Sequence, residues 1–217
     1  MEKLEKAKRM AMNRAWIVIL CALVFLAFAL AIRNSEVVRL DNRLIQDLDP
    51  LRTKPLIAFF SKLTDFGDSK LLILIIILSS LYLLLRRKIF ALILLPTAFI
   101  VERCLNEALK NQIMRHRPNF PHLVDVSGYS FPSGHAMNAS TVYGLLIILI
   151  TPLIGIKWIK VLWIGINLAM ILLIGFSRPF LRVHFFTDVL AGYSLGGLVV
   201  GLALLAMIFI ERRKNSR

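Results

Sequence analysis

Long apolar runs separated by short polar segments dominate the pattern of this chain. Each run has about the length that a helix needs to cross the hydrocarbon core of a bilayer, roughly 17–25 residues. The pattern predicts a membrane helix over each of six ranges: Ala15–Ile32, Leu71–Leu85, Ile89–Lys110, His135–Ile150, Ile159–Phe176 and Asp188–Ile210. We therefore expect an all-α protein built as a six-helix transmembrane bundle.

The second of these runs is shorter than the others. Ser69 can begin a helix before it, and Arg86 and Arg87 can extend their side chains to the headgroups from its far end. The sequence contains no Ser- or Gly-rich linker and no internal repeat between the runs. Residues 1–217 are therefore predicted to form a single domain.

The polar segment between the first two runs, Arg33–Lys70, contains a shorter apolar pattern. Its apolar residues recur at helical spacing: Leu56, Ile57, Phe59, Phe60, Leu63 and Phe66. Gly67 can end such a helix. We expect a short helix that lies flat in the membrane interface, where it either packs against the bundle or forms a lip that admits a lipid sideways.

Composition agrees with a membrane protein. The chain has 217 residues, 58% of them hydrophobic, and a mean hydropathy of +0.72, against roughly 45–50% apolar residues in soluble domains. The net charge of +14 would suit nucleic acid, but the cations cluster beside the apolar runs, at Lys3 to Arg14, Arg86–Lys88 and Arg212 to Arg217. Such clusters are typical of cytoplasmic loops and of contact with anionic headgroups, so we expect the bilayer as a partner and no nucleic acid.

The first apolar run follows basic residues and contains Ala29-Leu30-Ala31, which is similar to a signal-peptide cleavage site. The run is long for a signal peptide, so we expect an uncleaved anchor. Cys21 and Cys104 fall within the runs without metal-ligand spacing, and we interpret both as small apolar side chains.

Six helices leave both termini on one side of the membrane. Lys and Arg are divided almost evenly between the two sides, and Lys110, Arg117 and Arg178 have a second explanation as ligand contacts. Without those three residues, the balance favours cytoplasmic termini in a multi-pass protein of the cell (plasma) membrane.

Short polar motifs lie at the ends of four of the predicted helices. Lys110 and Arg117 follow the third, Ser133, Gly134 and His135 open the fourth, Arg178 follows the fifth, and His184 and Asp188 open the sixth. In such a bundle these positions share one membrane face, whichever way the protein is inserted. With cytoplasmic termini, that face is extracytoplasmic.

Each of these residues also has an ordinary role. Lys and Arg at helix ends usually reach headgroups, and Ser133 after Pro132 is a common helix start. The same Ser133 cap leaves backbone N–H groups at the positive end of the helix dipole, where Gly134 lets an anion approach closely. A functional site explains why all these groups lie on one membrane face better than chance does.

His184 and Asp188 are four residues apart, so they share one helix face if the sixth helix begins early enough. A carboxylate bonded to one imidazole nitrogen fixes the tautomer and leaves the other nitrogen as a nucleophile. His135 is then available as a general acid, and the three cations can surround the phosphoryl oxygens. The pattern therefore predicts cleavage of a phosphate ester.

In their order and spacing, these polar motifs resemble the three-part signature of the type 2 phosphatidic acid phosphatase (PAP2) superfamily. The signature reads Lys-x6-Arg-Pro, Pro-Ser-Gly-His and Ser-Arg-x5-His-x3-Asp, and residues 110–188 match it without departure. Within the superfamily the chain resembles small bacterial membrane enzymes related to phosphatidylglycerophosphatase B, which act on lipid phosphates and diphosphates. The resemblance implies a lipid phosphate substrate and no metal or other cofactor.

The resemblance also implies residue roles. His184 attacks phosphorus and becomes a phosphohistidine, Asp188 orients it, and His135 protonates the leaving group and then activates water. Five residues are implied to bind the phosphate: Lys110, Arg117, Arg178, Ser133 and Gly134. The implied substrates are phosphatidylglycerophosphate, phosphatidate, and undecaprenyl phosphate or diphosphate, with no obligatory protein partner.

Two other functions stay open at this point. A phosphotransferase would pass the phosphoryl group from His184 to an acceptor other than water, and a non-catalytic lipid transporter would keep the pocket without turnover. Three residues lie near the signature without belonging to it: Arg115, His116 and His122. They contact either a second phosphate of a diphosphate substrate or lipid headgroups.

Glu102 and Glu107 fall within the third predicted helix, where ionisable residues tend to face the bundle and to pair. Arg103 and the cations near the site are their candidate partners. The two carboxylates either support the fold or shape the substrate groove.

Overall fold

The computed structural model describes the backbone of residues 2–215 and the side chains of residue 12 and residues 15–210. The basic side chains of Lys3 to Arg14 and Arg212 to Arg217, which contribute to the predicted orientation, lie outside the described side chains. The described residues form eight α-helices and no strand: α1 (Glu2–Ala31), α2 (Ser35–Asp47), α3 (Lys54–Thr64), α4 (Ser69–Leu85), α5 (Ile89–Ile113), α6 (Gly134–Ile150), α7 (Lys157–Phe180) and α8 (Phe186–Asn215). The predicted all-α class is confirmed.

Short 3₁₀ turns follow three of the helices, at Asp49–Leu51, Asp65–Gly67 and Thr151–Leu153. Four helices are by themselves long and apolar enough to cross a membrane, namely α5, α6 with its following turn, α7 and α8. Two bent pairs bring the possible number to six. Residues 15–31 of α1 meet α2 at 95°, and α3 meets α4 at 53°.

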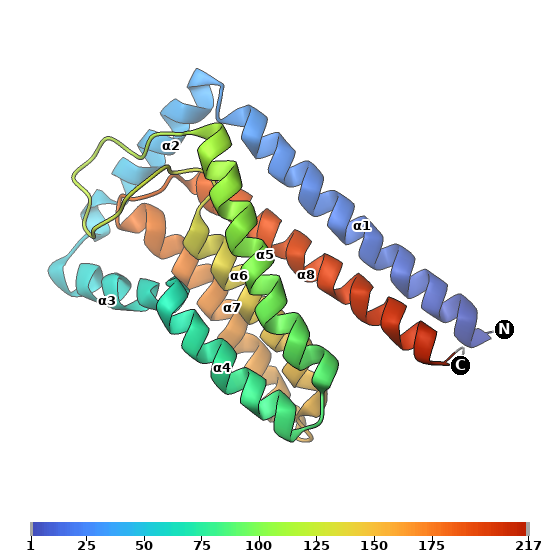
Figure 1. Ribbon diagram of the computed structural model, residues 1–217. Coiled ribbons are helices and arrows are strands. Elements are labelled where there is room, and N and C mark those ends of the chain that lie inside the picture. Colours follow the sequence, from blue (N-terminus) through green and yellow to red (C-terminus); the bar gives the residue numbers. More distant parts are fainter. Residues whose placement is uncertain (1, 216–217) are drawn as a thin grey trace.

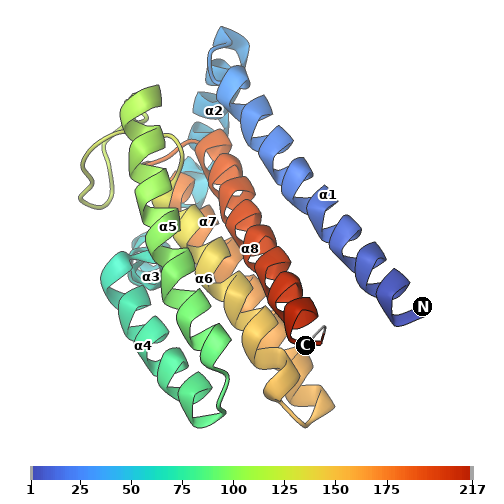
Figure 2. The same ribbon diagram turned by 45° about the vertical axis from the view of Figure 1, so that its right-hand side comes forward.

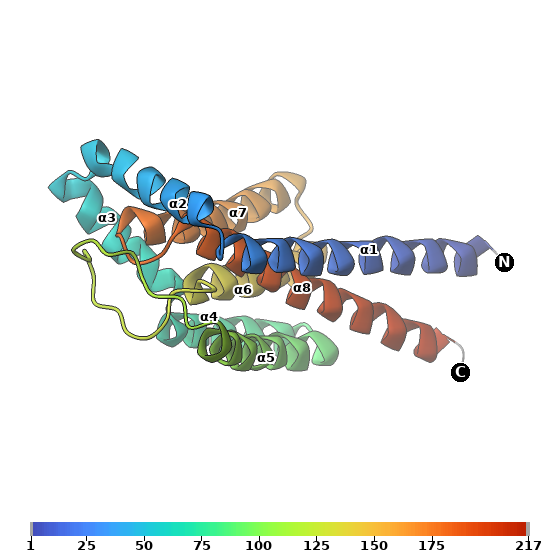
Figure 3. The same cartoon turned by 90° about the horizontal axis from the view of Figure 1, so that it is seen from above.

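The helices run side by side, so that the connections collect at two opposite ends of the bundle. Both termini and the α4–α5 and α6–α7 connections lie at one end (Figures 1 and 2). Helices α2 and α3, the loop from α5 to α6 and the short α7–α8 connection lie at the other. The view from above places α2, α3 and the α5–α6 loop away from both termini (Figure 3). All the signature residues therefore belong to one end of the molecule.

Helix α6 is the centre of the bundle. Thirteen of its residues are buried, whereas α1 and α4 expose large apolar side chains, such as Leu20 at 61% and Leu85 at 73%. An exposed apolar surface of this kind is what lipid chains cover in a membrane. The surface thus supports the same conclusion as the apolar runs, that the protein crosses the membrane several times.

Two glycines let α8 pack closely against α6 just below the functional end. A Cβ atom on Gly192 would come within 2.7 Å of the Ser133 carbonyl oxygen, and one on Gly196 within 1.9 Å of Ser140 Oγ. Small residues allow such close contact between membrane helices. The Ser133 backbone N–H also donates to the Asp188 carbonyl oxygen at 3.0 Å, so the first turns of α6 and α8 are held together.

The segment between α1 and α4 differs from the predicted single helix. It contains a second helix, α2, which the apolar pattern did not reveal because most of its residues are polar. The predicted helix ends at Thr64 and continues as the 3₁₀ turn Asp65–Gly67. Helix α8 begins at Phe186, two residues earlier than predicted, and leaves His184 in the connection before it.

Candidate active site

A cavity of about 360 Å³ opens at the end of the bundle that carries the signature residues. Of the eight predicted site residues, six line it: Lys110, Arg117, Gly134, His135, Arg178 and His184. The remaining wall comes from the end of α3, the turn that follows it, the start of α4, the loop before α6, and Arg103 and Asn138. Segments more than 120 residues apart in sequence, such as those of Ser61 and His184, therefore meet at one place.

Two arginines of the cavity are held by neutral oxygen atoms. Arg117 donates to four backbone carbonyls, including that of Val183 at 2.7 Å and that of Ser127 at 2.8 Å. Arg178 is almost fully buried and donates to Thr64 Oγ1 at 2.7 Å, while its Nε atom has no partner among the described residues. Carbonyl and hydroxyl partners fix the two side chains without neutralising their charge.

Lys110 completes this group of cations. It lies in the last turn of α5, beside the backbone of Gly134 that begins α6. The described residues include no carboxylate within ion-pair distance of Lys110, Arg117 or Arg178. Three cations around one cavity, none of them in an ion pair with a described residue, form a site for a multiply charged anion such as phosphate.

His184 is buried between a cation and a carboxylate. Its Nε2 atom lies 3.2 Å from Arg117 Nη1, and its Nδ1 atom lies 3.4 Å from Asp188 Oδ2. A guanidinium can only donate, so Nε2 accepts and the proton belongs on Nδ1, facing the carboxylate. Burial, and secondarily Arg117, lowers the pKa of His184 well below its usual range. The imidazole is therefore neutral at neutral pH, as a nucleophile must be.

Asp188 is itself fully buried and is held by several donors. Its Oδ2 atom accepts hydrogen bonds from the Ser130 hydroxyl and from the Phe185 backbone N–H, the latter at 2.9 Å. Its Oδ1 atom accepts from Arg115 Nη1 at 2.5 Å. This arrangement fixes the carboxylate and, through it, the orientation of the His184 ring.

Arg115 connects this carboxylate to the segment between α1 and α4. Its guanidinium lies 4.0 Å from the centre of the Phe185 ring and pairs with Asp41 Oδ2 at 2.9 Å. Asp41, a buried residue of α2, also accepts hydrogen bonds from the backbone N–H and the hydroxyl of Thr187. A residue far from the signature thus supports the position of Asp188.

Replacing Asp41 with asparagine should lower kcat for phosphate release by about ten-fold, the effect of weakening one charge-assisted contact. KM should change less than about two-fold, because Asp41 does not line the cavity. Asp47→Asn, at an exposed position of the same helix, is the matched control. Unchanged kcat in a folded Asp41→Asn protein would show that Arg115 holds Asp188 without this support.

His135 and its neighbours form the start of α6, beside the end of α5. Ser133 is the N-cap of the helix, and its side chain accepts from the Ala136 backbone N–H at 3.5 Å. Ser133 is fully buried and does not line the cavity, whereas Gly134 and His135 do. Of the predicted phosphate ligands, the Ser133 side chain is therefore engaged in capping, and Gly134 offers its backbone to the cavity.

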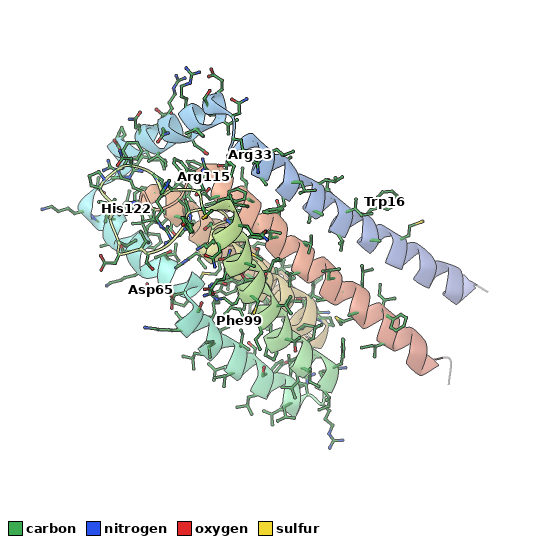
Figure 4. The ribbon with its side chains drawn as sticks, turned by 45° about the horizontal axis from the view of Figure 1, so that its top comes forward. Trp16, Arg33, Asp65, Phe99, Arg115 and His122 are labelled. Carbon is green, nitrogen blue, oxygen red and sulfur yellow. The ribbon has the colours of Figure 1, made fainter. Side chains whose placement is uncertain are left out.

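The three residues near the signature do not reach the cavity. Arg115 is engaged with Asp41 and Asp188, His116 packs edge-on to Tyr129, and His122 Nε2 lies 3.2 Å from the Pro118 carbonyl oxygen. Figure 4 shows Arg115 beyond the end of α5 and His122 out in the loop that follows. Contact with a second phosphate is therefore not a role that this geometry favours for them.

The two acidic residues of α5 differ from each other. Glu102 is fully buried, and both its carboxylate oxygens lack a hydrogen-bond partner among the described residues, whereas Glu107 is exposed. Neither forms an ion pair with Arg103 within the part of the chain that the structure describes. Adjacent residues of a helix point about 100° apart, which separates Glu102 from Arg103.

Sequence reasoning missed three residues that support the site: Asp41, Thr64 and Ser130. All three are buried polar residues in segments that carry no signature. Within the described residues, no group of three or more His, Cys, Asp or Glu side chains is placed to hold a metal ion. Cys21 and Cys104 form no disulfide.

Comparison with known protein families gives one match that covers the site. The sequence model described as the PAP2 superfamily matches residues 90–212. Phosphatidylglycerophosphatase B of Bacillus subtilis is 36% identical over 198 residues, which are 90% of this chain and 95% of that protein. Undecaprenyl-diphosphatase of Sulfolobus acidocaldarius is 32% identical over 118 residues, 52% of this chain and 53% of that protein.

Solved structures agree with the sequence comparison. The crystal structure of a transmembrane PAP2 type phosphatidylglycerolphosphate phosphatase from Bacillus subtilis has a TM-score of 0.82 at 33% identity, covering 87% of this chain and 94% of that one. The crystal structure of Aquifex aeolicus LpxE has a TM-score of 0.60 at 26% identity, and the match covers 75% of this chain and 93% of that one.

Proposed function

The chain belongs to the PAP2 superfamily as a membrane lipid phosphatase, and from this premise we propose that it hydrolyses its substrate through a phosphohistidine on His184. The observation that carries the proposal is the position of His184. Its Nε2 atom lies at a cavity lined by three cations that lack carboxylate partners among the described residues. A nucleophile beside a binding site for phosphate is the minimum that the reaction needs.

The reaction proceeds in two balanced steps. His184 Nε2 forms a bond to phosphorus while the bond from phosphorus to the leaving oxygen breaks and His135 gives that oxygen a proton. His135 then takes a proton from water, whose oxygen bonds to phosphorus as the P–N bond breaks and inorganic phosphate leaves. Asp188 balances the positive charge of the imidazole during both steps, and Lys110, Arg117, Arg178 and the Gly134 backbone stabilise the phosphoryl oxygens.

We propose that the substrate is a phosphomonoester or diphosphate of a lipid: phosphatidylglycerophosphate, phosphatidate or undecaprenyl diphosphate. The relatives support this range, because their names refer to phosphatidylglycerophosphate and to undecaprenyl diphosphate. The apolar residues that α3 exposes beside the cavity, Leu56 and Phe59, support access for a lipid from the membrane.

The proposed arrangement in the membrane has six spans, made by α1 and α4–α8, within one domain of residues 1–217. Helices α2 and α3 lie in the interface, an orientation supported by the bends of 95° and 53° that separate them from α1 and α4. The termini lie in the cytoplasm, and the cavity faces the extracytoplasmic side of the plasma membrane. No obligatory protein partner enters the mechanism.

Phosphate release by the purified protein in detergent tests the function. The protein is supplied with phosphatidylglycerophosphate, phosphatidate and undecaprenyl diphosphate in turn, and the rates rank the substrates. Release from at least one lipid is expected. Release from none, together with transfer of the phosphoryl group to a lipid or alcohol acceptor, would favour the phosphotransferase over the phosphatase.

We expect EDTA to leave the rate of phosphate release unchanged. Lys110, Arg117 and Arg178 supply the positive charge that a divalent metal ion would otherwise provide. Vanadate, which adopts the five-coordinate geometry of the transition state, should inhibit the same preparation. The rate is measured after dialysis against EDTA and again after addition of Mg²⁺, and a rate restored only by Mg²⁺ would contradict metal independence.

A further inference from the structure

Arg103 is a fourth cation of the cavity and has no part in the signature. It lies on α5, seven residues before Lys110, and both residues line the cavity. Seven residues make two helical turns, so the two side chains leave the same face of α5 about 10.5 Å apart along its axis. Phe99, which is labelled in Figure 4, precedes Arg103 by four residues, or one turn of α5.

Arg103 has no carboxylate within ion-pair distance among the described residues, although Glu102 and Glu107 are its neighbours on the helix. The cavity also has acidic residues, Asp65, Asp68 and Asp125, which come from the α3–α4 turn and the loop before α6. Asp68 caps α4 by accepting from the Lys70 backbone N–H at 2.9 Å. Four cations and three acids leave the cavity positive, with Arg103 at its inner end.

A charged side chain at this depth is costly unless it meets water or an anion. In the proposed mechanism the phosphate that reacts lies beside His184, and Arg103 is two turns of α5 further from that end than Lys110. Two phosphates that share a bridging oxygen both fit within reach of the three outer cations. Phosphates separated by a three-carbon alcohol are far enough apart for the second to reach Arg103.

We propose that Arg103 binds the second, non-reacting phosphate of a lipid in which a glycerol unit separates a phosphodiester from the terminal phosphomonoester. Phosphatidylglycerophosphate has this headgroup. The inference rests on the proposed function, because it assumes that the terminal phosphate reacts at His184. It assigns to Arg103 a role in substrate choice and none in the chemical steps.

The test compares kcat/KM for three lipids between the wild-type protein and R103Q, which keeps hydrogen-bond donors but loses the charge. For phosphatidylglycerophosphate we expect a loss of about 10- to 100-fold, the range for a charge-assisted contact to phosphate. Phosphatidate, with a single phosphate, and undecaprenyl diphosphate, with adjacent phosphates, should change less than about two-fold. R103K should keep part of the preference, because it keeps the charge.

Arg33→Gln is the matched control, since Arg33 is exposed at the end of α1 and does not line the cavity. An equal loss with all three lipids, a loss largest with undecaprenyl diphosphate, or no loss with any would overturn the assignment of Arg103. If R103Q does not fold, the kcat/KM values for the three lipids are compared between the wild-type protein and R103K instead. Absence of release by the wild-type protein would instead refute the proposed function, so the two failures are distinguishable.

Discussion

Replacing His184 with alanine should reduce phosphate release from every lipid substrate by at least about 10⁴-fold, the usual order for loss of a covalent nucleophile. The remaining cations would still bind phosphate, but the imidazole nitrogen that forms the P–N bond would be absent. The measurement is phosphate release by purified protein in detergent, with binding of a lipid phosphate followed separately. We expect binding to persist while turnover is lost.

His122→Ala is the matched control for this substitution. His122 is exposed in the loop before α6 and does not line the cavity, so its loss should leave the rate within about two-fold of the wild type. A second readout is the intermediate itself. Rapid quenching with substrate labelled at phosphorus should trap label on the wild-type protein and none on His184→Ala. Turnover near the wild-type rate in a folded His184→Ala protein would refute the mechanism.

Replacing His135 with alanine should lower turnover of lipid phosphates by about 10²- to 10⁴-fold, the range that general acid–base catalysis contributes. A lipid alcohol is a poor leaving group, so the first step depends on the proton that His135 donates. The second step also slows, because His135 takes the proton from water. Steady-state phosphate release and its comparison with His116→Ala, an exposed histidine outside the cavity, measure the effect.

The leaving group separates these two roles of His135. Nitrophenolate departs without a proton, so p-nitrophenyl phosphate should phosphorylate His135→Ala at a rate close to that of the wild type. Hydrolysis of the intermediate should stay slow, giving a burst of about one nitrophenolate per protein followed by slow release. A first step slowed equally with the lipid and with the aryl phosphate would mean that His135 does not act on the leaving group.

Sequence alone predicted the parts of the fold that have a local signal. The continuous apolar runs identify α5, α6, α7 and α8, and the structure and the PAP2 relatives confirm an all-helical membrane protein. Helix α2 was not predicted, because its residues are mostly polar and its contacts are distant in sequence. Asp41 bonds to Thr187, 146 residues away, and no local pattern encodes such a pair.

The candidate site also has a part that the sequence predicted and a part that it did not. The signature residues stand at predictable helix ends, and six of them line one cavity. Their supporting contacts were beyond sequence reasoning: Thr64 holds Arg178 across 114 positions, and Ser130 bonds to Asp188 across 58. Arg115 was recognised as a neighbour of the site, but its partners come from α2 and α8, so its direction depends on tertiary packing.

The close contact at Gly192 and Gly196 has a consequence for the response of the protein to its bilayer. A membrane thicker or thinner than the helices strains a protein by tilting its outer helices. Helices α6 and α8, which begin beside His135 and His184, pack closely at these glycines, and the Ser133–Asp188 hydrogen bond joins their first turns, so the pair resists tilting apart. Helix α1 makes a similar close contact with α8, at Gly201, so the mismatch is taken up by α4, whose lipid-facing side chains have room to move. We therefore expect the distance between the two histidines to change little with the thickness of the membrane.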